Sequence, residues 1–223
     1  MRAKMKFYSF WRSLASFRVR IALNLKNVPH EVVFVDIDKS EHRSNDYADI
    51  NPQMALPALV LDDDKVLTQS LAILEYLEET ISVPKLLPED TVGRARVRAL
   101  AAMVAGDMHP LIVPRVQRYL TEELKLAPEQ KTAWLRHWAG ESLRALEARL
   151  VRERETGRFA HGDNPTFADI CMVGLVTFAT AQGIDLAPYP TTLRIFKTAM
   201  ALPAFAAAHP LAQPDTPAAM RKT

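Results

Sequence analysis

The chain has 223 residues, 48% of them hydrophobic, and its 28 basic and 26 acidic residues leave a formal net charge of +2. This length allows one large domain or two small ones, each with its own core. The near balance of charge, without long Lys/Arg runs, argues against nucleic acid as the main partner. The single cysteine, Cys171, excludes an intramolecular disulfide and any Cys-x-x-Cys redox or zinc site.

The N-terminus does not have the pattern of a signal peptide, because charged residues recur throughout it. No apolar run approaches the roughly 20 residues that a membrane-spanning helix needs. The sequence therefore predicts a cytoplasmic protein without a membrane partner.

The first part of the chain mixes predicted strands and helices. In chain order the predicted elements are a strand at 6–10, a helix at 13–26, a strand at 30–37, a hairpin of strands at 57–61 and 65–67, and a helix at 69–80. The order β-α-β, loop, β-β-α places a parallel pair first and an antiparallel pair second. It predicts a thioredoxin-like domain over residues 1–82, with the helix starts gathered at one edge of the sheet.

The rest of the chain is predicted to be helical. Residues 81–88 form a linker with two prolines, and the all-helical domain extends over 89–223. Its predicted helices are 89–119, 128–152, 166–181 and 191–201. Thr166 and Asp169 form a capping-box pattern that opens a nearly all-apolar helix, so this helix should be buried. The Pro-rich tail from Ala212 is expected to be loose.

The junction between the first strand and first helix contains the sequence Arg12-Ser13-Leu14-Ala15-Ser16. A helix start carries unpaired N–H groups and the positive end of the dipole, which favour an anion such as a thiolate. A hydroxyl there can donate a hydrogen bond to that anion. In the alternative interpretation, Ser13 or Ser16 is a plain N-cap.

Three further features accompany this junction. Pro57 precedes the third strand, either as a cis proline that exposes the preceding backbone to a peptide-like ligand or as a turn proline opening an edge strand. Ser70, after Gln69, is placed to cap the next helix, whose free N–H groups suit a carboxylate. His109-Pro110 interrupts a predicted long helix, and Arg115 follows six residues later in the same helix.

In order and spacing these motifs, together with 86–88 and 166–169, resemble glutathione transferases. The tail segments 185–190 and 213–217, and residues 18–23, resemble the zeta class in particular. The resemblance extends from about Lys6 to the end of the sequence. It implies an N-terminal thioredoxin-like domain that holds glutathione, a helical domain that supplies most of the site for the second substrate, and a homodimer.

The resemblance also implies roles for individual residues. Ser13 would stabilise the glutathione thiolate, and the Leu56 backbone before cis Pro57 would pair with the cysteinyl part. The other implied contacts are Gln69 and Ser70 with the γ-glutamyl end, His42 and His109 with glutathione, and Arg12 and Arg115 with substrate carboxylates.

The implied activity is the glutathione-dependent cis–trans isomerisation of a maleylacetoacetate-type dicarboxylate in aromatic catabolism, without a metal. The chain departs from the family pattern in three places: Ala15 replaces an active-site cysteine, Ala55 replaces a glutamine, and Thr180-Ala181 stands where an arginine is usual. Two alternatives therefore stay open. One is a general transferase or dehalogenase acting on another small electrophile, and the other is a non-catalytic binding protein.

Overall fold

The computed structural model describes residues 5–221, which form two compact units. One unit combines the residues up to Pro84 with those from Leu202 onward, and the other is Lys85–Ala201. Within the described residues, no helix combines the length and apolar character required to cross a bilayer.

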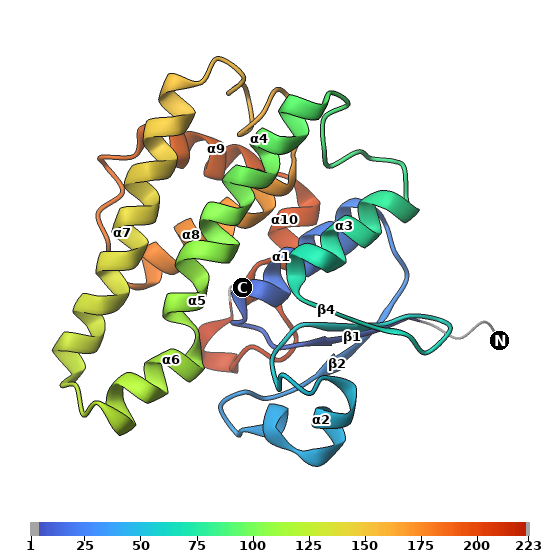
Figure 1. The fold of residues 1–223 in the computed structure, drawn as a ribbon, viewed down its shortest axis with the longest axis vertical. Helices are drawn as coiled ribbons and strands as arrows, with labels where there is room; N and C mark the ends of the chain where they lie inside the picture. The colour runs from blue at the N-terminus through green and yellow to red at the C-terminus, as the bar shows by residue number, and fades with distance from the viewer. Residues whose placement is uncertain (1–4, 222–223) are drawn as a thin grey trace. The chain divides into compact units, whose positions relative to one another are not determined.

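The first unit contains a four-stranded sheet in the order β2-β1-β3-β4 (Figure 1). The strands are β1 (Lys6–Ser9), β2 (Glu31–Phe34), β3 (Ala58–Val60) and β4 (Val66–Thr68). β1 runs parallel to β2 and antiparallel to β3, which is antiparallel to β4. The predicted thioredoxin-like arrangement of a parallel pair and an antiparallel pair is confirmed.

Helices α1 (Leu14–Leu25) and α3 (Ser70–Thr80) pack against each other and supply much of the core of this unit. Apolar residues at helical spacing on both helices are fully buried, among them Phe17, Ile21, Ile73 and Leu77. A short helix lies in the predicted loop: α2 (Asn45–Ile50) begins where the Ser44 hydroxyl accepts a hydrogen bond from the Tyr47 N–H at 3.2 Å.

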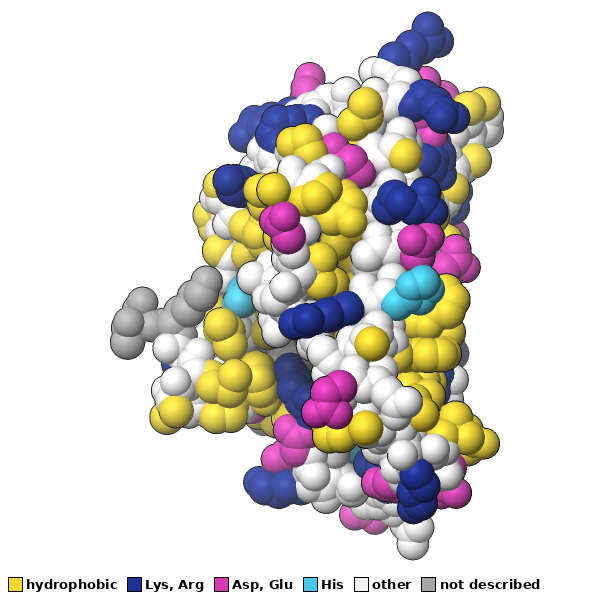
Figure 2. Space-filling view, turned by 90° about the vertical axis from the view of Figure 1, so that its left-hand side faces the viewer, with side chains coloured by type: hydrophobic (Ala, Val, Ile, Leu, Met, Phe, Trp, Pro, Cys, Tyr) yellow, Lys and Arg dark blue, Asp and Glu magenta, His cyan; other side chains and the backbone are white. Residues whose placement is uncertain are grey.

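The face of the molecule shown in Figure 2 carries charges of both signs. Figure 2 shows Lys and Arg side chains interspersed with Asp and Glu on the face in view, with hydrophobic side chains between them. This pattern accords with the small net charge of +2.

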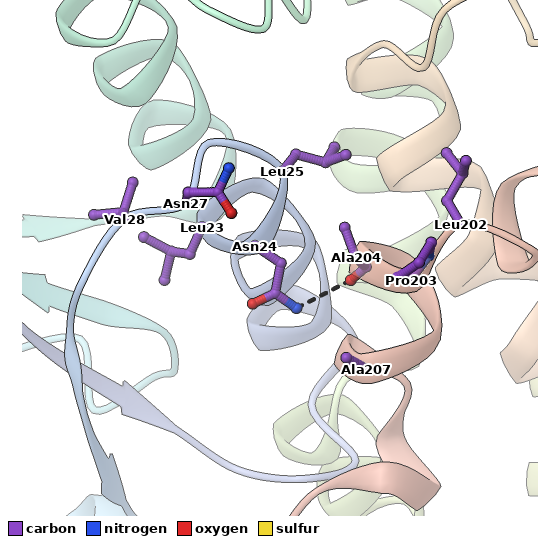
Figure 3. A pocket seen from close by; sticks show the side chains of 9 residues that line it. All are labelled: Leu23, Asn24, Leu25, Asn27, Val28, Leu202, Pro203, Ala204 and Ala207. Atoms are coloured by element: carbon purple, nitrogen blue, oxygen red, sulfur yellow. Dashed lines mark hydrogen bonds between the residues drawn. The ribbon is translucent and has the colours of Figure 1, made fainter.

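The tail of the chain packs on the first unit. Helix α10 (Pro203–Ala208) contacts α1 and belongs to the first unit, although the helical domain predicted from the sequence, 89–223, includes these residues. A hollow of about 550 Å³ opens between the C-terminal end of α1 and α10, where the Asn24 side-chain amide donates to the Ala204 carbonyl at 3.0 Å (Figure 3).

The expectation that the tail from Ala212 is loose is wrong. The Thr216 side chain is buried, and its hydroxyl donates to the Pro210 carbonyl at 2.6 Å. The Arg221 guanidinium donates to the Thr216 carbonyl at 2.9 Å and to the Pro214 carbonyl at 2.5 Å. These side-chain-to-backbone bonds order a segment in which Pro214 and Pro217 have no backbone N–H to donate.

The second unit is helical throughout its described secondary structure. Its helices are α4 (Thr91–Ala102), α5 (His109–Ile112), α6 (Pro114–Arg118), α7 (Pro128–Arg152), α8 (Phe167–Ala181) and α9 (Pro190–Met200), with π-helical segments at Met103–Met108 and Tyr119–Glu123. The predicted single helix over 89–119 is therefore wrong in detail. Val113 is extended, with ψ 154°, because a residue before proline avoids the helical region.

Helix α8 lies at the centre of this unit and packs against α4, α7 and α9. Asp169, fully buried, accepts hydrogen bonds from the Ala160 N–H at 2.8 Å, the Thr166 N–H at 2.8 Å and the Thr166 hydroxyl at 2.9 Å. The burial of this helix is confirmed, and so is the half of the capping box in which the Asp169 carboxylate accepts from the N-cap N–H; the Thr166 hydroxyl donates to the same carboxylate rather than capping the helix.

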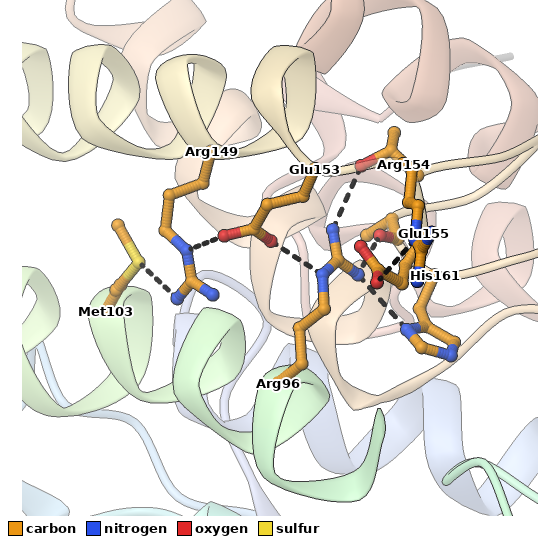
Figure 4. A network of polar contacts seen from close by, with 9 residues as sticks. Arg96, Met103, Arg149, Glu153, Arg154, Glu155 and His161 are labelled. Carbon is orange, nitrogen blue, oxygen red and sulfur yellow. Dashed lines mark hydrogen bonds and ion pairs between the residues drawn. The ribbon is translucent and has the colours of Figure 1, made fainter. Parts of the chain in front are cut away.

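A polar network joins α4 to the end of α7 and the loop that follows (Figure 4). The Arg96 guanidinium donates to Glu153 at 2.6 Å, to the Ala160 carbonyl at 2.8 Å and to the Thr156 hydroxyl at 3.0 Å. The second Glu153 oxygen accepts from Arg149 at 2.6 Å. The Arg96 guanidinium and the Glu153 carboxylate both have hydrogen-bond partners. This cluster therefore stabilises the second unit and is not a candidate reactive site.

Candidate functional site

The sheet register places four predicted site segments at one edge of the first unit. Ser9 pairs with Phe34, so the segments that follow β1 and β2 leave the sheet on the same side. Ala58 pairs with Tyr8 and with Thr68, so the start of β3 lies beside the ends of β1 and β4. The turn before Ser13, the segment containing His42, the Leu56–Pro57 bond and the Gln69–Ser70 pair therefore all begin at this edge.

Ser13 is the N-cap of α1. Its backbone is extended, with φ −68° and ψ 114°, and its hydroxyl oxygen accepts from the Ser16 N–H at 3.2 Å. This bond uses a lone pair of Oγ and leaves the hydroxyl proton available for donation. Capping and anion binding are therefore compatible at Ser13. Ser16 is fully buried, so Ser13 is the accessible hydroxyl of the two.

The Leu56–Pro57 peptide bond is cis and leads into β3. β3 pairs with β1 on one side and β4 on the other, so the interpretation of Pro57 as opening an edge strand is wrong. The preceding Ala55 carbonyl is held by the Asn51 side-chain amide at 2.6 Å and the Tyr47 hydroxyl at 2.8 Å. Within residues 5–221 the Leu56 backbone makes no hydrogen bond, and it therefore suits pairing with a peptide-like ligand.

The start of α3 differs from its prediction. Gln69, in a left-handed conformation with φ 66°, is the N-cap, and Ser70 is the first helical residue. Ser70 is therefore not the N-cap, and its hydroxyl accepts from the buried Arg18 guanidinium at 3.0 Å. The Gln69 side-chain amide donates to Gln53 at 2.7 Å. The first N–H groups of α3 still have no partner within the helix and suit a carboxylate.

The two predicted carboxylate-binding arginines have different surroundings. Arg12, about half exposed, forms an ion pair with Asp38, and its guanidinium lies 5.6 Å from the centre of the Phe10 ring. Arg115 is exposed on α6 and forms no ion pair with any of the described residues. The assumption of one helix joining His109 to Arg115 is wrong, because Val113 separates α5 from α6.

The two predicted histidines lie in different units. His42 is buried in a short 3₁₀ turn, Glu41–Arg43, of the first unit. His109 begins α5 in the second unit, where its backbone N–H bonds to the Val104 carbonyl five residues earlier, as in a π-helix.

Two buried arginines support this edge and were not selected from the sequence as functional. Arg18 contacts Ser70, and Arg20, about 5% exposed, donates to the Phe10 carbonyl at 3.2 Å and the Trp11 carbonyl at 2.9 Å. The available signal was their position on a helix whose neighbouring residues are apolar, since arginine is seldom buried without partners.

No group of three or more His, Cys, Asp or Glu side chains in the described part of the chain is arranged to hold a metal ion. The hollow beside α10 contains none of the predicted site residues. Cys171 is fully buried in α8. The helix starts and the cis-proline segment therefore form the candidate site of the first unit.

Two sequence families match the chain: "Glutathione S-transferase, N-terminal domain" over residues 12–80 and "Glutathione S-transferase, C-terminal domain" over residues 103–203. A maleylpyruvate isomerase of Ralstonia sp is 43% identical over 212 residues, covering 95% of this chain and 100% of the relative. A maleylacetoacetate isomerase of Pseudomonas aeruginosa is 42% identical over 217 residues, covering 96% and 100%.

Solved structures of the same family are similar to this chain over nearly its whole length. A maleylpyruvate isomerase, described as a bacterial glutathione S-transferase of the zeta class, superposes with a TM-score of 0.92 at 42% identity, covering 95% of this chain and 100% of that one. A maleylacetoacetate isomerase of Methylobacterium extorquens AM1, with bound malonate and glutathione, superposes with a TM-score of 0.93 at 50% identity, covering 96% and 100%.

Proposed function

This chain belongs to the glutathione S-transferase family, and from that premise we propose that it is a glutathione-dependent cis–trans isomerase of a maleylacetoacetate-type dicarboxylate. The observation that carries the proposal is the placement of Ser13 at the N-terminus of α1, on the sheet edge that also bears the cis Leu56–Pro57 bond. The names of the relatives support the reaction type. The malonate bound to the Methylobacterium extorquens enzyme supports a dicarboxylate as substrate.

The residues of the first unit fit glutathione. The Leu56 backbone, without a hydrogen bond within residues 5–221, would pair with the cysteinyl part, and the N–H groups that begin α3 would receive the γ-glutamyl carboxylate. Gln69 and Ser70 border that carboxylate position. His42 and, from the second unit, His109 would complete the binding.

When bound, glutathione supplies a nucleophilic thiol, which suits reversible addition to a conjugated cis double bond. Ser13 donates its hydroxyl proton toward the sulfur and, with the α1 dipole, favours the ionised thiol. Arg12 and Arg115 hold the carboxylates of the substrate.

The second candidate function is a general transferase or dehalogenase acting on a neutral electrophile. The ion pair between Arg12 and Asp38 favours it, because a substrate carboxylate would have to compete with Asp38. Ala15 and Thr180-Ala181, at positions where the family has other residues, favour it as well. A non-catalytic binding protein is the third possibility, and the accessible Ser13 hydroxyl argues against it.

Turnover of maleylacetoacetate, maleylpyruvate and a chloronitrobenzene, each with and without glutathione, separates these functions. We expect glutathione-dependent isomerisation of at least one maleyl substrate. Activity on the aryl halide alone would favour the transferase, and no activity on any substrate despite glutathione binding would favour the binding protein. Light scattering tests the proposed homodimer, and fractionation of cells tests the proposed cytoplasmic location.

We further propose that Arg12 and Arg115 converge on one anionic substrate. Replacing Arg115 with alanine should raise the KM for a maleyl substrate by about tenfold or more, since a hydrogen bond to a charged group contributes roughly 1.5–3 kcal/mol. The KM for a neutral aryl halide should stay nearly constant.

Arg118→Ala is the matched control, because Arg118 lies on the same helix and faces Glu122 at 3.8 Å. Equal losses on acidic and neutral substrates would assign Arg115 a structural role. An experimental structure of the complex with the two guanidinium groups more than roughly 15 Å apart would exclude convergence, since a dicarboxylate with two contacts of about 3 Å does not reach that far.

A further inference from the structure

The turn that presents Ser13 is held from two sides. It is closed by a hydrogen bond from the Ser13 N–H to the Phe10 carbonyl at 3.1 Å. The Trp11 N–H donates to the Asp215 carboxylate at 2.8 Å, and the Trp11 carbonyl accepts from Arg20 at 2.9 Å. Both backbone polar groups of Trp11 are therefore fixed by charged side chains, two residues before the Ser13 hydroxyl.

Asp215 reaches the turn from an ordered part of the tail. Its neighbour Thr216 is about 1% exposed and is tied to Pro210, and the Thr216 N–H donates to the Gln213 carbonyl at 3.1 Å. Arg20 links the same two segments, because it also donates to the Ala208 carbonyl at the end of α10 at 2.9 Å. The tail and the turn thus form one hydrogen-bonded assembly within the first unit.

The Asp215 carboxylate accepts no hydrogen bond from another residue of the tail among residues 5–221. One Asp215 oxygen accepts from Trp11, and the other is buried without a hydrogen-bond partner among residues 5–221. Burial raises the pKa of Asp215, and the nearby Arg20 charge opposes that rise. A charged acceptor on a backbone N–H makes a stronger hydrogen bond than a neutral one, so the contact to Trp11 gains most from the carboxylate.

We propose that Asp215 is a positioning residue for the reaction: by holding the Trp11 peptide it orients the turn so that the Ser13 hydroxyl proton points to the sulfur of glutathione. This proposal rests on the proposed function of Ser13. Asp215 does not contact the reacting atoms in it. A small rotation of the turn would leave Ser13 able to cap α1 while directing its proton elsewhere, because the capping bond uses only a lone pair.

The test measures the ionisation of bound glutathione by its ultraviolet thiolate absorbance, without any second substrate. Asp215→Ala should raise the pKa of the bound thiol by about one unit and lower kcat about tenfold, the equivalent of one hydrogen bond to a charged group. The KM for glutathione should change little. Asp215→Asn, which retains only a neutral acceptor for the Trp11 N–H, should recover part of both losses.

Two further variants isolate positioning from stability. Gln213→Ala removes bonds to the Ala207 and His209 carbonyls within the tail but leaves the Trp11 contact, so its thiol pKa should match the wild type. In a Ser13→Ala background, Asp215→Ala should shift the thiol pKa no further, because both act through one hydroxyl.

An unchanged thiol pKa in Asp215→Ala, or shifts that add in the double variant, would overturn the inference. A wild-type protein that binds glutathione without lowering its thiol pKa would instead overturn the proposed role of Ser13. The two failures are therefore distinguishable in one titration series.

Discussion

Replacing Ser13 with alanine is expected to lower glutathione-dependent turnover by about ten- to a hundredfold while the protein remains folded. Ser13 has the accessible hydroxyl at the start of α1, and its proton is not used in capping. Removing one hydrogen bond to an anion forfeits roughly 1.5–3 kcal/mol, which corresponds to that range of rates. The apparent pKa of the bound thiol should rise in parallel. Steady-state kinetics and the thiolate absorbance measure the two effects.

Because Ser13 is also the N-cap, the alanine variant should lose about 1 kcal/mol of folding free energy as well. Ser13→Asp separates the two roles, since aspartate caps helices well but, when ionised, has no proton to donate. It should restore stability and not activity. Ser16→Ala is the matched control one turn later, at a fully buried hydroxyl. Wild-type activity in Ser13→Ala would mean that Ser13 is only a cap and that a backbone N–H activates the thiol.

Asp169→Ala is expected to lower the free energy of unfolding by about 2–4 kcal/mol. Three donors, on Ala160 and Thr166, lose their acceptor inside the second unit, and buried unsatisfied donors are among the larger sources of destabilisation. Asp169→Asn keeps the volume and one acceptor oxygen, so its loss should be smaller. Denaturant titration monitored by circular dichroism measures both. Equal stability of the alanine variant and the wild type would show that α8 begins without this cap.

The same residue predicts a pH dependence. Burial raises the pKa of Asp169 from its ordinary 3.8 to about 6, against hydrogen bonds that lower it. The folded state therefore binds a proton between these values that the unfolded state has released. The contribution of Asp169 is fully present below about pH 4 and falls as the pH rises to about 6, by up to roughly 3 kcal/mol. The difference in stability between wild type and Asp169→Asn, followed from pH 4 to 7, should show this decline and then level off.

Local sequence patterns predicted most of the fold because the relevant physics is local. The alternation of strands and helices in the first 80 residues, and the Thr166–Asp169 pattern, depend on periodicity and capping within a few residues. Proline at position 114 also has a local effect, yet the predicted helix 89–119 continues across it. The extended Val113 shows that the rule for the residue before proline outweighed the helical periodicity.

The candidate site was only partly predictable. Ser13 and Pro57 lie where the order of strands and helices placed them. The partner of Ser70 is Arg18, 52 residues away, and that of Arg12 is Asp38, 26 residues away. Such contacts depend on how the first unit packs, and no pattern within a few residues encodes them. The tail was predicted to be loose for the same reason: its composition is Pro-rich, and the bond between Asp215 and Trp11 spans 204 positions.

The bond between Trp11 and Asp215 has a consequence for the order in which the protein is made. The helical unit, Lys85–Ala201, is contiguous and can complete its packing once its last residues leave the ribosome. The sheet-containing unit emerges first, yet Arg20 and Trp11 must wait for Ala208 and Asp215. The nascent chain therefore passes through a stage in which the sheet can form while the turn before Ser13 lacks half of its support. The segment synthesised first acquires its final geometry last, after nearly all of the chain has been translated.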